Sequence, residues 1–279
     1  MKPETTAESL AKLTNERKKR MTTPPINILL NEGVGIIELA RPDKFNALSR
    51  ECFTHIRHAL RQFEGDSLTR VVLIRAQGKN FCTGADLEEI GSFDMEGVQA
   101  TKNARLMHGG LRDLERSRLP VVAAVQGLCL AGGLELMMAC DVVLASNSAR
   151  FGDQHARYGL IPGAGGSQRL PRLVGLRRAL DLMFAASWID AETARQWGLV
   201  NYVYSDDALQ EAAQAYCRAL AKKNGSSIAI MKRLAREGLE LSLDLGLEAE
   251  IAEVGHVASS AGAREGVAAF LAKREPNFG

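Results

Sequence analysis

The stretch that decides the fold runs from residue 121 to residue 146 and reads VVAAVQGLCLAGGLELMMACDVVLAS. Its apolar residues 121–125 predict a buried strand, and the glycines in residues 127–133 predict a tight loop. Residues 134–139 predict the start of a helix. A strand, a loop and a helix in direct succession are typical of an α/β protein.

The glycine pair in this stretch can form a binding site for a negative charge. Gly132 and Gly133 carry no side chain, so their amide N–H groups can face a ligand where the helix dipole also favours an anion. Glu135 follows two residues after the pair and would lie beside that charge. Two interpretations stay open, because a glycine pair can also serve close packing alone and a glutamate suits any helix start.

Composition narrows the class of protein. The 279 residues are 46% hydrophobic, which is enough for one large core with a small appendage. The 35 basic and 33 acidic residues are too balanced for a protein that binds nucleic acid, so no nucleic-acid partner is expected. Gln126, Glu135 and Asp141 interrupt the longest apolar stretch, which therefore predicts a protein core and not a membrane span.

The cysteines indicate a reducing compartment. They are odd in number and have no paired short spacing, so we expect buried thiols in a soluble cytoplasmic protein. No spacing of cysteine or histidine fits a structural zinc site, and no metal is expected. The five are Cys52, Cys82, Cys129, Cys140 and Cys217.

Three regions follow from patterning along the chain. Residues 1–25 are polar and predict a flexible extension or a short surface helix, residues 26–200 a core, and residues 201–279 a helical region. The strands expected in the core and beyond are a hairpin at 26–39 around Asn31-Glu32-Gly33, then 71–75, 142–145 and 199–204. The helices expected are 49–63, 95–119, 173–186, 239–257 and 263–274, and the loops are 78–85 and 159–166.

Five segments resemble one known family in order and separation. They are ARPDKFNALS at 40–49, FCTGADL at 81–87, VQGLCLAGGLELMMACDVVLAS at 125–146, FGDQHARYGLIPGAGGSQRLPRLVG at 151–175 and REGVAAFLAKREPNF at 264–278. From residue 26 to its end the chain is similar to the enoyl-CoA hydratase/isomerase family, the crotonases. The resemblance implies an α/β spiral of strand-strand-helix repeats in two roughly perpendicular sheets. It also implies that the C-terminal helices build a homo-oligomer, a trimer or a hexamer.

The same resemblance implies an acyl-CoA thioester as substrate and no separate cofactor, because coenzyme A enters as part of the substrate. The amides of Ala85 and Gly132 would form an oxyanion hole for the thioester oxygen. The resemblance implies that the backbone near Thr83 contacts the adenine of CoA and that Asp86, Leu87 and Glu88 line the entrance. It also implies nucleotide contacts from Phe270 and Lys273 near the C-terminus, with Lys44 as a weaker phosphate candidate.

Hydratases of this family hold one water between two glutamates. The first maps to Glu135, but the second falls where this chain reads FGDQH, at His155. An imidazole with a pKa near 6.5 can accept or donate a proton at neutral pH, so it can share the water with Glu135. Asp153 would face the same side of an extended segment, and either residue can take the role.

The leading interpretation is a lyase that adds water across the 2,3 double bond of an enoyl-CoA. Another crotonase reaction through the same enolate is the alternative: isomerisation, decarboxylation or hydrolysis of a carbon–carbon bond in a β-keto acyl-CoA. Because Glu135 is kept and the second acid is replaced, simple isomerisation is disfavoured. A protein that only binds acyl-CoA, or RNA through the basic residues 17–20, is a further alternative.

Overall fold

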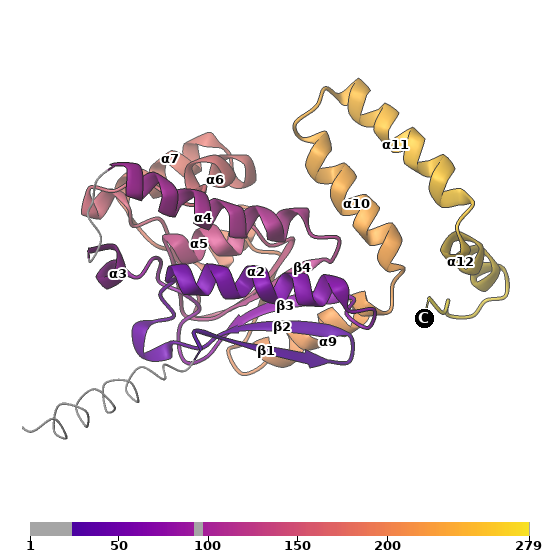
Figure 1. Cartoon of the computed structure of the whole chain (residues 1–279), viewed down its shortest axis with the longest axis horizontal. Coiled ribbons are helices and arrows are strands. Elements are labelled where there is room, and N and C mark those ends of the chain that lie inside the picture. Colours follow the sequence, from indigo (N-terminus) through magenta and orange to yellow (C-terminus); the bar gives the residue numbers. More distant parts are fainter. Residues whose placement is uncertain (1–23, 92–96, 279) are drawn as a thin grey trace, which may run out of the picture.

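Two β-sheets organise the described part of the chain, which comprises residues 24–91 and 97–278 of a computed structural model (Figure 1). Within these residues the larger sheet has the order β1-β2-β3-β4-β6-β9 and the smaller one the order β5-β7-β8. The strands of the larger sheet are β1 (Ile26–Asn31), β2 (Val34–Leu39), β3 (Val71–Ala76), β4 (Val121–Val125), β6 (Val142–Ser146) and β9 (Tyr202–Tyr204). Those of the smaller sheet are β5 (Leu128–Leu130), β7 (Arg150–Gly152) and β8 (Ile189–Asp190).

The helices lie on both faces of the larger sheet and beyond it (Figure 1). Those between β2 and β8 are η1 (Pro42–Lys44), α2 (Arg50–Gly65), α3 (Leu87–Gly91), α4 (Gly97–Arg116), α5 (Gly132–Met138), η2 (Ala156–Tyr158), α6 (Gly166–Val174) and α7 (Leu176–Ala185). Those after β8 are α8 (Ala191–Gln196), α9 (Leu209–Ala221), α10 (Gly225–Gly238), α11 (Leu243–Ala258) and α12 (Ala261–Leu271).

The expected hairpin is confirmed at β1 and β2. These strands pair antiparallel, with Asn31 opposite Val34 and a two-residue turn between them. Glu32 and Gly33 have φ values of 50° and 78°, and positive φ at both positions is what a type I′ turn requires. Each of the other strand pairs in the larger sheet is parallel.

Alternate residues of the central strands enter two separate cores, because successive side chains of a strand point to opposite faces. Val72 and Ile74 of β3 pack with α2 and α4, whereas Val71 and Leu73 pack against α9. Both faces of the sheet are thus covered, as is usual for parallel strands. An α/β spiral with helices on both faces confirms the expected fold class.

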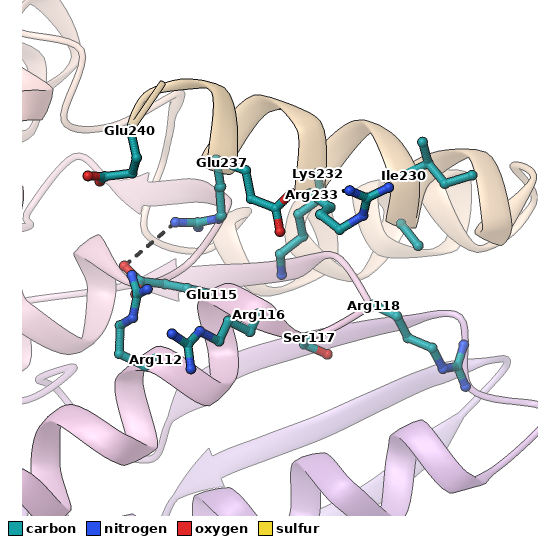
Figure 2. A pocket seen from close by; sticks show the side chains of 12 residues that line it. Arg112, Glu115, Arg116, Ser117, Arg118, Ile230, Lys232, Arg233, Glu237 and Glu240 are labelled. Carbon is teal, nitrogen blue, oxygen red and sulfur yellow. Dashed lines mark hydrogen bonds and ion pairs between the residues drawn. The ribbon is translucent and has the colours of Figure 1, made fainter. Parts of the chain in front are cut away.

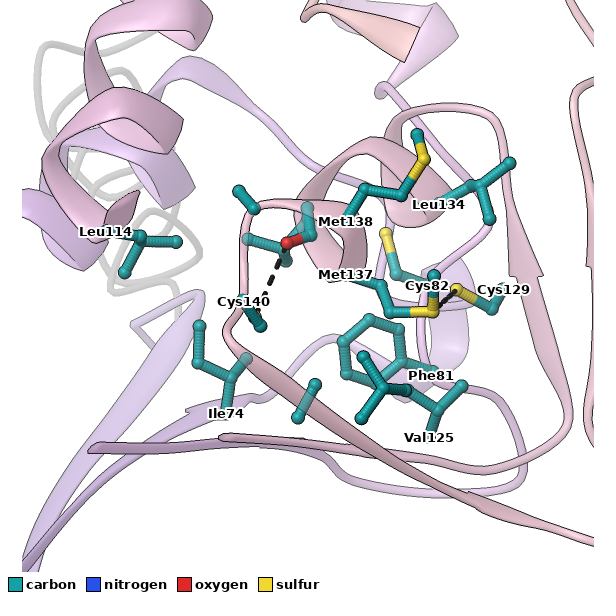
Figure 3. Close-up of a cluster of buried hydrophobic side chains, with 14 of the residues drawn as sticks. Ile74, Phe81, Cys82, Leu114, Val125, Cys129, Leu134, Met137, Met138 and Cys140 are labelled. Atoms are coloured by element: carbon teal, nitrogen blue, oxygen red, sulfur yellow. Dashed lines mark hydrogen bonds between the residues drawn. The ribbon is translucent and has the colours of Figure 1, made fainter. Parts of the chain in front are cut away.

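Helix α5 lies inside the larger core and therefore fixes the direction of its acidic residue. Leu134, Met137 and Met138 are buried, and Figure 3 shows them beside Cys82 and Cys129, whose backbones form an isolated β-bridge. A helix of seven residues has little stability of its own, so this packing holds it in place.

Several boundaries differ from the sequence prediction. The loop expected at 127–133 contains strand β5, and α5 begins at Gly132, two residues before the expected start. The helix expected at 173–186 is two helices, because Gly175 with φ 84° separates α6 from α7. The short strands β7 and β8 gave no periodic signal. Residues 95 and 96 of the expected helix 95–119 lie outside the described residues, and α4 ends at Arg116.

Helices α10 to α12 extend away from the sheets (Figure 1). Strand β9 pairs with β6 and α9 packs on the sheet, and α10 to α12 follow these two elements in the chain. No residue of α10 or α11 is buried in this chain. Leu243, Ile251 and Phe270 are 76%, 63% and 81% exposed. The extension expected at 1–25 lies, up to residue 23, outside the described residues.

Candidate active site

Glu135 is a buried carboxylate in the first turn of α5. It is 2% exposed, and its Oε1 accepts hydrogen bonds from the amides of Ala164 at 2.8 Å and Gly166 at 2.7 Å. Burial raises the pKa of Glu135, and the amides of Gly166 and Ala164 offset only part of this effect. The carboxylate is thus oriented by main-chain donors and is more basic than an exposed glutamate.

The second glycine-rich loop is shaped to make these bonds. Gly165 has a φ of 104°, a conformation that favours glycine. A Cβ atom on Gly166 would lie 3.2 Å from Oε1 of Glu135, closer than ordinary contact. Gly165 and Gly166 therefore let the loop come close enough to Glu135 for the amides of Ala164 and Gly166 to reach its carboxylate.

The amides of Ala85 and Gly132 lie side by side where two backbone segments meet. A Cβ atom on Gly132 would lie 3.3 Å from the nitrogen of Ala85, and Gly84 has a φ of 116°. Gly132 is the first residue of α5, so its N–H has no acceptor within the helix. Neither amide donates a hydrogen bond to another described residue.

Residue Ala131, directly before this pair of amides, has a strained backbone. Its φ of 48° and ψ of −117° are unusual for a residue with a side chain. Its N–H donates to the carbonyl of Gly152 at 2.9 Å, which fixes the turn against β7. Backbone strain of this kind gathers at functional sites.

His155 and Asp153 form a hydrogen-bonded pair at the start of η2. Nδ1 of His155 lies 2.9 Å from Oδ1 of Asp153, and the backbone N–H of His155 donates to the same oxygen at 3.0 Å. Burial acts to lower the pKa of His155, but the hydrogen bond and charge of Asp153, with the charge of Glu135, outweigh it and raise that pKa. The Asp153 side chain is 2% exposed against 13% for His155, so the imidazole is the more accessible of the two.

The residues expected at the entrance lie together around the start of α3. Asp86 forms an ion pair with Arg41 at 2.7 Å, and Glu88 one with Lys44 at 2.6 Å. Burial acts to raise the pKa of Asp86, but Arg41 and the amide of Glu89 outweigh it, so the net shift is downward. Thr83 donates its N–H to the carbonyl of Phe45 at 3.2 Å. The remaining member of this group, Leu87, is 56% exposed.

The C-terminal pair expected to contact the nucleotide lies elsewhere in this chain. Phe270 is on α12 and Lys273 follows it, and Figure 1 shows α12 and α3 at opposite ends of the molecule. A single chain therefore does not bring Phe270 and Lys273 to the entrance residues.

Some contributors to the site were not predicted from the sequence. The amides of Ala164 and Gly166 hold Glu135, and the GAGG run at 163–166 was the available signal for such a loop. Asp153 was weighed only as a rival to His155 and is its hydrogen-bond partner.

The described residues contain no group of three or more side chains suited to hold a metal ion. Within residues 24–91 and 97–278, no helix has the length and apolar character needed to cross a membrane.

A buried carboxylate and two main-chain amides that donate to no other described residue are the groups that an enzyme needs to stabilise negative charge on a reacting carbonyl oxygen. The family model described as enoyl-CoA hydratase/isomerase matches residues 30–279. The chain belongs to this family, which confirms the resemblance drawn from the five segments.

Curated relatives and solved structures agree with this assignment. The chain is 33% identical to the short-chain-enoyl-CoA hydratase of Clostridium acetobutylicum, over 89% of this chain and 95% of the relative. It is 32% identical to the crotonyl-CoA hydratase of Syntrophomonas wolfei, over 90% of this chain and 97% of the relative. The crystal structure of an enoyl-CoA hydratase from Bacillus anthracis superposes with a TM-score of 0.87 at 33% identity, covering 91% of this chain and 98% of that one.

Proposed function

We propose that this protein is an enoyl-CoA hydratase, a lyase that adds water across the 2,3 double bond of an acyl-CoA thioester. One observation carries the proposal. The unpaired amides of Ala85 and Gly132 adjoin the helix turn that carries Glu135. This arrangement suits a thioester, because addition to its double bond moves negative charge onto the carbonyl oxygen.

The reaction begins with the thioester oxygen between the two amides. Glu135, made more basic by burial, takes a proton from water, and the hydroxide oxygen bonds to C3. The electron pair of the double bond moves to the thioester and forms an enolate, which the amides of Ala85 and Gly132 stabilise. Each such donor contributes about 100- to 1000-fold in rate.

His155 supplies the second proton. Its raised pKa favours the imidazolium, which gives a proton to C2 as the enolate collapses. The proton held by Glu135 then returns to the imidazole and restores the pair. Asp153 is a positioning residue, because its carboxylate accepts a hydrogen bond from Nδ1 and leaves Nε2 to exchange the proton.

We also propose a homo-oligomer, a trimer or a hexamer, built by α10 to α12. The apolar side chains of α11 and α12 are exposed in the single chain, and an interface of this kind would bury them. In such an assembly Phe270 and Lys273 can reach the CoA of another copy, near Thr83, Asp86, Leu87 and Glu88. The reaction needs no cofactor beyond the CoA of the substrate.

The five cysteines are buried and free, which fits a reducing compartment such as the cytoplasm.

The test is loss of the enoyl thioester absorbance with crotonyl-CoA and with longer or branched enoyl-CoAs. The matched variant Glu135→Gln keeps an oxygen for the amides of Ala164 and Gly166 but removes the base, so it should lose about 100- to 10,000-fold in kcat. If no enoyl-CoA loses absorbance with the wild type, the alternative reactions of the family replace hydration. If the glutamine variant hydrates at the wild-type rate, Glu135 does not activate water.

A further inference from the structure

Helix α4 carries another buried carboxylate, Glu115. Glu115 is 7% exposed, and Arg169 of α6 binds it through two bonds, Nε to Oε1 at 2.7 Å and Nη2 to Oε2 at 3.1 Å. Two-bond pairing of this kind fixes the plane of a guanidinium. The third nitrogen of Arg169 can therefore point in one direction only.

Figure 2 shows Glu115 at one end of a pocket between α4 and α10, beside Arg112 of its own helix. Arg112 lies 3.3 Å from Oε2 and Arg236 of α10 lies 3.6 Å from Oε1. Burial acts to raise the pKa of Glu115, but Arg169, with Arg236 and Arg112, outweighs it and holds the pKa below its ordinary value. The carboxylate thus stays charged near neutral pH and keeps its hold on Arg169.

The remaining nitrogen of Arg169 reaches the loop that holds Glu135. Nη1 donates to the carbonyl oxygen of Ala164 at 2.6 Å, and the amide of the same Ala164 donates to Oε1 of Glu135 at 2.8 Å. A Cβ atom on Gly165 would collide with Nη1 of Arg169, so the glycine leaves room for the guanidinium. A continuous chain of polar contacts therefore joins Glu115 to Glu135.

We infer that Arg169, locked by Glu115, is a positioning residue that holds the Ala164 peptide in the orientation in which its amide aims Glu135 at the substrate. This role rests on the proposed function of Glu135 as the base. The role of Arg169 has a further consequence. If the loop at residues 163–166 is no longer held, Glu135 loses the hydrogen bonds that the amides of Ala164 and Gly166 donate to it. Those donors act to lower the pKa of Glu135, so their loss raises it further.

Several charged groups besides Arg169 affect the pKa of Glu135 or lie near Arg169, so their effects on the pH profile must be separated from that of Arg169. His155 and Asp153 act on Glu135 from the β7 side, and Arg169 acts through the Ala164 loop. His108 of α4 lies near Arg169, and burial with the charge of Arg169 lowers the pKa of that histidine. A His108→Gln variant therefore serves to show that an altered pH profile does not come from this histidine.

The test compares Arg169→Met with Arg172→Met in the full chain, using crotonyl-CoA. Arg172 is exposed on the same helix and donates to the carbonyl of Gln168, so its loss is a matched control. For Arg169→Met, kcat should fall about 10- to 100-fold, as for a misplaced catalytic group, and the acidic limb of the pH profile should move to higher pH. Arg172→Met should keep the wild-type rate and limb.

Two variants that keep part of the contact between Glu115, Arg169 and Ala164 separate a loss of positioning from a loss of folding. Arg169→Lys keeps the charge opposite Glu115 but cannot bind both it and the Ala164 carbonyl as a fork, so its rate should fall between those of wild type and Arg169→Met. Glu115→Gln removes the charge that holds Arg169, so the acidic limb of the pH profile should also move to higher pH. A lowered rate with an unshifted limb in all three would mean that the pair only supports folding and would overturn the inference.

Failure of this inference differs from failure of the proposed function. If Glu135→Gln abolishes hydration while Arg169→Met keeps the wild-type kcat and limb, only the role of Arg169 is wrong. If Glu135→Gln has no effect, the proposed base is wrong and the role of Arg169 is wrong with it.

Discussion

Replacing Gly132 with alanine should slow hydration strongly while leaving the fold intact. The new methyl carbon would lie 3.3 Å from the nitrogen of Ala85 and at the same distance from two backbone atoms of Gly84, so those atoms must shift by a few tenths of an ångström. Such a shift displaces the Ala85 amide, one of the two proposed donors to the thioester oxygen. Loss of one donor of this kind costs about 100- to 1000-fold in rate.

The fold should survive the change for two reasons. Gly132 is not among the residues with positive φ, so alanine can adopt its backbone conformation. The contacts of 3.3 Å are also only slightly shorter than ordinary van der Waals contact, so a small shift of the neighbouring atoms relieves them.

The assay is kcat and KM for crotonyl-CoA, with the melting temperature measured on the same samples. Gly65→Ala is the matched control, because a Cβ atom there meets nothing within 4 Å at the end of α2. A Gly132→Ala variant with wild-type kcat and an unchanged melting temperature would refute the role given to the two amides.

Four further results are expected. The rate should rise with pH through the raised pKa of Glu135 and fall above the raised pKa of His155, because the base must be ionised and the imidazole must carry its proton; a flat profile from pH 5 to 9 would contradict this. His155→Ala should lose about 100- to 10,000-fold in kcat, whereas His155→Glu, which restores a second carboxyl group, should retain most of the activity; a wild-type kcat for His155→Ala would remove the imidazole from the mechanism. Gly133→Ala would force its methyl group into the carbonyl of Cys82, so it should cost about 1–3 kcal/mol of stability, and an unchanged melting temperature would argue against this close packing. Ile251→Asp on exposed α11 should convert a trimer or hexamer to smaller species in light scattering, and an unchanged mass would exclude this face from the interface.

The sequence allowed the fold to be predicted where the signal was local. The hairpin needed only apolar strands around Glu32-Gly33, and α2 needed only an apolar period after Ser49, whose hydroxyl accepts the N–H of Cys52. Strand β5 was missed because its three residues lie between glycines and owe their conformation to pairing with β7. A signal that depends on a distant strand cannot be obtained from periodicity.

The candidate site shows the same division. Glu135 was identifiable because a carboxylate in an apolar stretch after two glycines is unusual. The role of Asp153 depends on the backbone turn at His155. This turn brings both the imidazole and the backbone N–H of His155 to the Asp153 carboxylate. The contact of Arg169 with Glu115 spans 54 positions in the sequence, so no spacing rule could have paired them.

The most direct measurement is a crystal structure of the protein with a bound acyl-CoA. We predict that the thioester oxygen lies about 2.7–3.1 Å from the nitrogens of both Ala85 and Gly132, with a carboxylate oxygen of Glu135 beside the carbon that receives the hydroxyl group. A thioester oxygen bound away from either amide, or Glu135 directed away from C3, would contradict the account.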